Sequence, residues 1–426
     1  MDYEQIDMGC YHLHIIKTKK FKTVTVEVNF RRKMQKEEIT IRNLLKSVLL
    51  STTNNYKTER SLIQETENLY DLKLVSSNMR IGNYSNLSFK VRFLNEMYTE
   101  PEMNEYSIAF LMEILFQPHV ENNAFSDEVV KKCKNKLEKS IQKLPDNKLK
   151  YTLFKLLETT ENMPYSYNPY GYIEDLEKIT PSSLYEYYQS VLRDDYVDVF
   201  VVGDVDIPKI KTLFKQYFRV KTFKKGKNNI LVEELKPRKR IKKIVENDEA
   251  NQSQLTLFCT LNELTTFERK YVLLVYNEML GGSSNSLLFD TVREKNSYAY
   301  YINSTQKSYD NILMIYSGIE SGNSQNVLKL IRKTLQNITK GNFSETILEN
   351  SKETIIASIK ASTDSPAGII NTYYAKVLVN SDDFEERIKN IKKVTKEDIM
   401  RLGKKINIHT MYLLEGKGKE EEDEAN

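Results

Sequence analysis

The sequence predicts an α+β protein made of two homologous halves, each with a mixed or antiparallel sheet and helices packed on one face. The first observation behind this prediction is an internal repeat with a period of about 215 residues, far longer than the repeats of solenoid proteins. The second is that alternating and helical apolar patterns follow each other in the same order in both copies. Strands grouped around a layer of helices are typical of α+β architecture.

The repeat is clearest in two helical segments. FSDEVVKKCKNKLEKSIQK, which begins at Phe125, aligns without a gap with FSETILENSKETIIASIKA, which begins at Phe343. Further along, KITPSSL from Lys178 corresponds to KVTKEDI from Lys393, and both copies then continue into an apolar segment that ends in glycine, VFVVGD or MYLLEG. Because the matches keep their order at a nearly constant offset, we interpret them as two copies of one domain.

In the first half, residues 24–30 and 87–93 alternate between apolar and polar, which predicts two half-buried strands. Apolar residues within 41–49 recur at helical spacing, which predicts an amphipathic helix. The remaining predicted elements are helices over 103–116, 126–143, 148–160 and 181–192 and a closing strand over 197–202.

The second half repeats this order. Alternation over 255–259 predicts a strand, a helix follows over 266–280, and the GGSSNS sequence at 281–286 predicts a turn into a second helix that ends near 292–295. The rest of this half is predicted to contain strands over 298–304 and 311–318 and helices over 324–338, 344–361, 366–379 and 395–405.

These patterns divide the chain into an N-terminal domain over 1–218 and a C-terminal domain over 246–416. The segment 219–245 between them is strongly basic and is predicted to be an exposed linker. The last residues, 417–426, are mostly acidic and are predicted to be a disordered tail.

Composition excludes several functional classes. The 63 Lys and Arg residues nearly balance the 59 Asp and Glu residues, which leaves a net charge of +4 and argues against a nucleic-acid-binding protein. The start of the chain lacks the pattern of a secretory signal, and no apolar run approaches the ~18 residues of a membrane span. We therefore expect a cytoplasmic protein that has no membrane partner.

Metal-binding and nucleophile motifs are absent from the sequence. The four histidines do not pair at the spacing of an HExxH or HxxEH helix, and no GxSxG or Walker sequence occurs. Cys10, His12 and His14 alternate on a possible strand, but Cys10 and His14 would lie roughly 13 Å apart at ~3.3 Å per residue. Because a closed zinc site takes about four ligands, we expect no metal and no cofactor in this chain.

The two-fold organisation, the segment VVGDVDIPKI and above all LGGSSNSLLFDTVREKNSYAY at 280–300 resemble the M16 metallopeptidases, the family of pitrilysin, insulinase and mitochondrial processing peptidase. The resemblance extends over about 10–416 and implies two LuxS/M16 metallopeptidase-like halves. In that family an HxxEH helix and a later glutamate hold zinc in the first half. The second half, often on another subunit, supplies an arginine and a tyrosine from a stretch that begins R-E-K and ends A-Y.

Placed on this sequence, the resemblance puts Leu44 and Val48 at the two histidine positions and Ser47 at the position of the catalytic glutamate. The third ligand position falls on Ser140, with Glu138 as the alternative. Zinc requires imidazole, thiolate or carboxylate ligands, which aliphatic side chains cannot replace. The resemblance therefore implies a degenerate zinc site and no activity of the isolated chain.

The second half keeps the family pattern, with Arg293 and Tyr300 seven residues apart and with Gly281 and Gly282 in the loop expected to border the substrate chamber. The resemblance implies a non-catalytic subunit that pairs with an HxxEH-bearing homologue, which holds the zinc. In the pair, Arg293 and Tyr300 would reach the partner's peptide substrate and stabilise negative charge on its carbonyl oxygen.

The resemblance also suggests a biological setting. In low-GC Gram-positive bacteria, such subunits occur in pairs known as elongation factor P 5-aminopentanol modification-associated proteins, and this chain resembles the member without zinc. An alternative remains open. The chain could be a structural scaffold with no role in peptide hydrolysis, like the core subunits of the respiratory bc1 complex that resemble this family.

Overall fold

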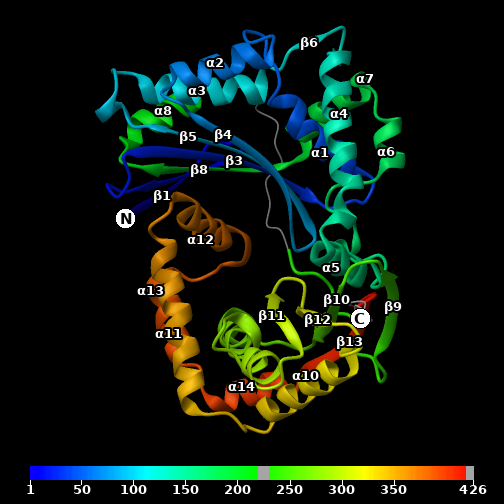
Figure 1. Cartoon of the computed structure of the whole chain (residues 1–426). Helices are drawn as coiled ribbons and strands as arrows, with labels where there is room; N and C mark the ends of the chain where they lie inside the picture. Colours follow the sequence, from blue (N-terminus) through cyan, green and yellow to red (C-terminus); the bar gives the residue numbers. More distant parts are fainter. Residues whose placement is uncertain (219–229, 419–426) are drawn as a thin grey trace, which may run out of the picture. The chain divides into compact units, whose positions relative to one another are not determined.

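The computed structural model describes residues 1–218 and 230–418, and the chain divides into two compact units (Figure 1). Unit 1 contains residues 1–143, 168–230 and 364–371, and unit 2 contains residues 144–167, 231–363 and those from 372 onward. Each unit thus includes a segment from the other half of the sequence. Residues 219–229 of the predicted linker and residues 419–426 of the acidic tail lie outside the described residues.

Unit 1 is built on a six-stranded sheet in the order β1-β2-β8-β3-β5-β4. Strands β2 and β8 are parallel, and every other neighbouring pair is antiparallel. The strands are β1 (Asp2–Asp7), β2 (His12–Lys17), β3 (Thr23–Lys33), β4 (Lys73–Ile81), β5 (Tyr84–Leu94) and β8 (Tyr196–Gly203).

The helices of unit 1 bury the apolar face of this sheet. Alternate residues of β3, from Val24 to Phe30, form one core with apolar side chains of α1 and its neighbours, as expected for a strand whose successive side chains point to opposite faces. The helices are α1 (Glu38–Leu49), α2 (Glu59–Asn68), α3 (Met103–Phe116), α4 (Asp127–Gln142), α6 (Ile173–Lys178), α7 (Pro181–Asp194) and α8 (Ile207–Tyr217), and a small hairpin is formed by β6 (Val120–Glu121) and β7 (Ala124–Phe125).

Unit 2 contains a five-stranded sheet in the order β11-β12-β10-β13-β9, in which only β13 and β9 are parallel. The strands are β9 (Lys242–Asp248), β10 (Gln252–Leu261), β11 (Ala299–Lys307), β12 (Ile312–Glu320) and β13 (Ile406–Gly416). The helices are α5 (Lys148–Glu158), α9 (Leu273–Asn277), α10 (Ser324–Thr339), α11 (Glu345–Ser362), α12 (Pro366–Val379), α13 (Phe384–Lys392) and α14 (Lys396–Gly403); α12 begins within unit 1. Three π-helical turns also occur, at Glu268–Val272, Glu278–Gly282 and Phe289–Glu294.

The two sheets have the same topology. Read as β2-β8-β3-β5-β4 and β9-β13-β10-β12-β11, they match strand for strand, and the parallel pair occupies the same place in both. The prediction of two α+β halves is therefore confirmed. Strand β1 is an addition to the first sheet, and α2 and β4, which the sequence patterns did not predict, complete unit 1.

Helix α5 distinguishes unit 2 from unit 1. In β10, Leu257 and Cys259 face one core, whereas Phe258 points to the opposite face of the sheet. There Phe258 packs in a second core that contains Leu156 of α5 and Tyr412 of β13. A segment from the first half of the sequence thus covers one face of the sheet of unit 2.

The segment that follows residue 229 has no regular structure until β9, but it is anchored. Ile230 is buried in unit 1, where its carbonyl oxygen accepts a hydrogen bond from the amide of Asn83 (3.0 Å). Val232 is buried in unit 2, where its amide donates to the carbonyl oxygen of Tyr309 (2.8 Å). None of the described helices is long and apolar enough to cross a membrane.

Candidate functional site

The expected zinc positions lie on α1 and α4, two helices of unit 1 that pack against each other. Leu44 and Val48 are fully buried and belong to the apolar core. Ser47 is half-buried, and the hydroxyl of the exposed Ser140 donates to the carbonyl oxygen of Lys136 within α4 (3.0 Å). These side chains do not fit a zinc ion, and no group of three or more His, Cys, Asp or Glu in the described part of the chain could hold a metal.

A buried ion pair that sequence patterns did not reveal fixes α1. Arg42 Nη2 donates to Asp195 Oδ2 (2.6 Å) and to the carbonyl oxygen of Phe30 (2.7 Å), and both charged side chains are inaccessible to solvent. The second carboxylate oxygen of Asp195 accepts from Arg32, which also pairs with Glu38 (3.1 Å). Burial alone would lower the pKa of Arg42, but its interactions with Asp195 and Tyr187 together outweigh burial and raise that pKa. The helix is thus held as a structural element.

The two N-terminal histidines surround a carboxylate. His14 Nε2 and His12 Nδ1 lie 3.3 and 3.6 Å from Asp198 Oδ1, and Arg31 Nη1 donates to Asp198 Oδ2 (2.9 Å). Burial raises the pKa of Asp198, but hydrogen bonds with both histidines and the charge of Arg31 hold it well below its usual range. Cys10 precedes β2, and Cys10, His12 and His14 are not among any group in the described residues that could hold a metal ion.

Arg293 lies in the π-helical turn Phe289–Glu294, and its side chain is 46% exposed. Its guanidinium lies over the ring of Phe289, with 4.8 Å to the ring centroid. The amides of Ser297 and Tyr298 donate to the carbonyl oxygens of Arg293 and Val292 (3.0 and 3.1 Å), so the chain folds back from this turn directly into β11. The turn also packs against β11.

Tyr300 occupies a β-bulge at the start of β11. Ala299 pairs with Ile319 and Tyr301 pairs with Gly318, which leaves Tyr300 as the extra residue between them. Such bulges re-aim side chains and often occur near active sites. Tyr300 is 53% exposed, whereas the Tyr301 hydroxyl donates to Gln254 and Ala299 is buried. Tyr300 is therefore not a core aromatic residue.

Gly281 and Gly282 lie where the preceding helix ends against β11. A Cβ atom on Gly281 would lie 2.7 Å from the amide nitrogen of Ser304 and 2.8 Å from its hydroxyl oxygen, so only glycine permits this close approach. Gly282 is exposed beside the carboxylate of Glu278. Both glycines and the turn of Arg293 thus border the strand that carries Tyr300. A contact of the glycines with substrate stays a prediction.

Comparison with a family model adds evolutionary evidence. Residues 178–355 match the model described as "Peptidase M16 inactive domain". A curated relative from Bacillus subtilis, "Probable inactive metalloprotease YmfF", is 32% identical over 412 residues, which cover 95% of this chain and 95% of the relative. A second protein of the same organism, "Uncharacterized zinc protease YmxG", is 30% identical over 269 residues, which cover 62% of this chain and 63% of that protein.

The fold also matches a solved structure. The crystal structure of a conserved protein from Enterococcus faecalis V583 superposes with a TM-score of 0.91 and is 26% identical in sequence. The match covers 99% of this chain and all of that one. The two-unit organisation is therefore shared over the whole length.

Proposed function

Because this chain belongs to the M16 peptidase family and lacks zinc ligands at the expected positions, we propose that it is the non-catalytic subunit of a two-chain peptidase. An HxxEH-bearing homologue would be its partner and would hold the zinc. The observation that carries the proposal is the contrast between the two units. Leu44 and Val48 are core residues, whereas the bulge of β11 holds Tyr300 with more than half of its side chain exposed.

The chemistry assigned to this chain is electrostatic. Attack on a peptide bond places negative charge on the carbonyl oxygen, and a phenol or guanidinium donor aimed at that oxygen stabilises the tetrahedral state. Tyr300 suits this role because its hydroxyl makes no hydrogen bond within residues 1–218 and 230–418. Arg293 suits it because its guanidinium is partly exposed and is paired only loosely with Glu294, at 3.9 Å. Both donors would act on substrate bound by the partner.

Pairing is supported by the two relatives from Bacillus subtilis, since the organism that encodes the inactive relative also encodes one named as a zinc protease. The test is reconstitution. The chain and the HxxEH homologue from the same genome are purified separately and mixed, and complex formation is followed by analytical ultracentrifugation. Peptide hydrolysis is measured with a quenched fluorescent peptide library for each chain and for the mixture.

We expect that the mixture hydrolyses peptide and that the separate chains either do not, or do so far more slowly. A homologue that is fully active alone and forms no complex with this chain would contradict the proposal. A complex without any gain in hydrolysis would instead favour the structural scaffold.

We propose modification of elongation factor P as the setting in which the pair acts, on the strength of the sequence resemblance alone. Deletion of the gene for this chain should change the intact mass of elongation factor P purified from the cells. An unchanged mass distribution would separate the pair from this modification without affecting the peptidase proposal.

A further inference from the structure

Unit 1 contains two surface hollows that share the lining residue Gln117, which directly follows α3. The first has a volume of about 430 Å³ and lies between the β6–β7 hairpin, α7 and the segment after α1. The second has a volume of about 440 Å³ and lies between α2, α3 and the end of α8. We call the two together the Gln117 groove. None of its lining residues belongs to the expected zinc positions or to the Arg293 and Tyr300 region.

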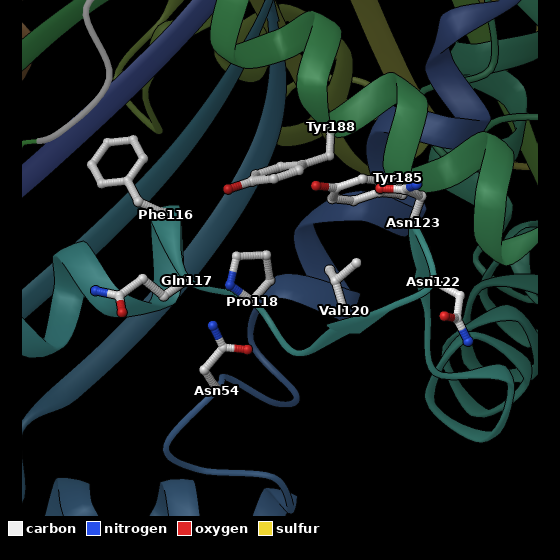
Figure 2. A pocket seen from close by; sticks show the side chains of 9 residues that line it. All are labelled: Asn54, Phe116, Gln117, Pro118, Val120, Asn122, Asn123, Tyr185 and Tyr188. Carbon is white, nitrogen blue, oxygen red and sulfur yellow. The ribbon is translucent and has the colours of Figure 1, made fainter.

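The first hollow is neutral and rich in hydrogen-bonding groups (Figure 2). The side-chain amides of Asn54, Asn122 and Asn123 and the hydroxyl of Tyr185 line it, and these side-chain groups make no hydrogen bonds with the described chain. A primary amide offers both donors and an acceptor, which matches the N–H and C=O groups of a peptide backbone. No charged residue of the described chain lines this hollow, so a phosphate or carboxylate ligand would find no cation there.

Aromatic rings give the first hollow an apolar wall. Figure 2 shows the rings of Tyr185 and Tyr188 from α7 near Pro118 and Val120, with Asn54 on the opposite side. The Tyr188 hydroxyl donates to the carbonyl oxygen of Leu115 (2.8 Å), which fixes that ring in place. A pocket with an apolar wall and a few convergent polar groups is the usual form of a ligand site.

The second hollow combines aromatic rings with carboxylates. Tyr56 and Phe110 pack edge to face, with 5.6 Å between ring centroids, and Tyr106, which is 53% exposed, lines the same hollow. Glu65 and Glu113 contribute their carboxylates, and no Lys or Arg is among the described residues that line the hollow. Aromatic faces and carboxylates together attract organic cations.

The charge of Glu113 has no cationic partner in the described chain. Its carboxylate is instead oriented by three neutral donors, the Thr53 hydroxyl (2.5 Å), the Asn55 amide (3.2 Å) and the Asn55 side chain (3.0 Å). Glu65 accepts from the Asn68 side chain (3.1 Å), which is also neutral. Within residues 1–218 and 230–418, the two carboxylates are therefore held in place by neutral donors and have no cationic partner.

We propose that the Gln117 groove binds an extended peptide segment that carries a lysine or arginine. The basic side chain enters the aromatic and acidic hollow, and the neighbouring backbone contacts the amides of the first hollow. This site is independent of the proposed peptidase role, since its binding is a property of the isolated chain.

The test uses the full chain and two fluorescein-labelled probes, the capped peptide Ala-Leu-Lys-Leu-Ala and the same peptide with norleucine in place of lysine. Binding is measured by fluorescence anisotropy at low and high salt. The lysine probe should bind about tenfold more tightly than the norleucine probe, with a difference that shrinks as salt screens the carboxylates.

Variants separate the two hollows. Glu65→Gln should weaken the lysine probe roughly fivefold and leave the norleucine probe unchanged, because it removes charge but not shape. Asn122→Gly should weaken the binding of both probes by a similar factor. Glycine is compatible with the backbone at this position, where φ is 50°. Glu67→Gln, on the exposed side of α2, is the control and should change neither.

Equal binding of both probes, or binding of neither at millimolar concentration, would overturn the proposal. A Glu67→Gln variant as weak as Glu65→Gln would also overturn it, because the effect would then come from overall charge.

Discussion

The buried ion pair between Arg42 and Asp195 should hold α1 in place, and its loss should measurably destabilise the chain. Asp195→Asn keeps the shape of the side chain but removes the charge that compensates two guanidinium groups. Two unit charges about 4 Å apart interact by ~4 kcal/mol at an effective dielectric constant near 20. Removing one partner of a buried pair typically costs ~3–5 kcal/mol, because the other charge stays buried and unpaired.

We therefore expect Asp195→Asn to lower the free energy of unfolding by about 3–5 kcal/mol. Urea unfolding followed by circular dichroism measures this loss, since the chain has no tryptophan for fluorescence. Hydrogen exchange should show the lost protection in α1.

Asp194→Asn is the matched control. Asp194 is the preceding residue, and its pair with Arg193 is on the surface, with side-chain exposures of 64% for Arg193 and 38% for Asp194. Exposed pairs contribute ~0–1 kcal/mol, so this variant should unfold almost like the wild type. If Asp195→Asn costs no more than Asp194→Asn, the buried pair does not anchor α1 and our reasoning about this helix is wrong.

Three further predictions concern unit 2 and metal binding. Leu156→Ala should destabilise the chain by ~2–5 kcal/mol in the same urea assay, because Leu156 is fully buried where α5 covers the sheet; an unchanged midpoint would argue against that packing. Burial and the charges of Arg238 and Lys242 lower the pKa of His409 to about 4. Between pH ~6.5 and 4 the unfolded chain therefore binds a proton at this residue more readily than the folded chain does. The free energy of unfolding should fall across that window by about 1–3 kcal/mol as the pH is lowered. His409→Gln should lessen that fall, whereas an identical pH profile would contradict the assignment. The purified chain should contain no stoichiometric zinc by elemental analysis, and one tightly bound zinc per chain would disprove the degenerate site.

Much of the fold could be predicted because its helices and central strands have strong periodic patterns. The predicted helix over 126–143 corresponds closely to α4, and the strand over 24–30 lies within β3. Strand β4 was missed because it is at the edge of the sheet, where its burial pattern has no clear alternation. The helix at α5 was predicted, but periodicity identifies an apolar face and not the sheet against which it packs.

The site could be predicted only in part. The loss of the zinc ligands can be predicted from the residue types at Leu44, Ser47 and Val48. The exposure of Tyr300 depends on a β-bulge, which no local sequence pattern predicts. The partners of Arg42 and Asp198 are distant in sequence, at Asp195 and Arg31 among others, so their pairing could not be derived from spacing.

If Tyr300 acts in the partner's active site as proposed, the turnover of the reconstituted pair depends on its hydroxyl. Tyr300→Phe removes only a hydroxyl from an exposed side chain, and Tyr298→Phe, at a partly buried tyrosine beside the core of unit 2, is the control. Loss of one oxyanion donor typically lowers turnover ~10²–10³-fold. We predict a loss of this size for Tyr300→Phe with unchanged complex formation and near wild-type turnover for Tyr298→Phe. Full turnover with Tyr300→Phe in an active pair would show that the Tyr300 hydroxyl takes no part in hydrolysis.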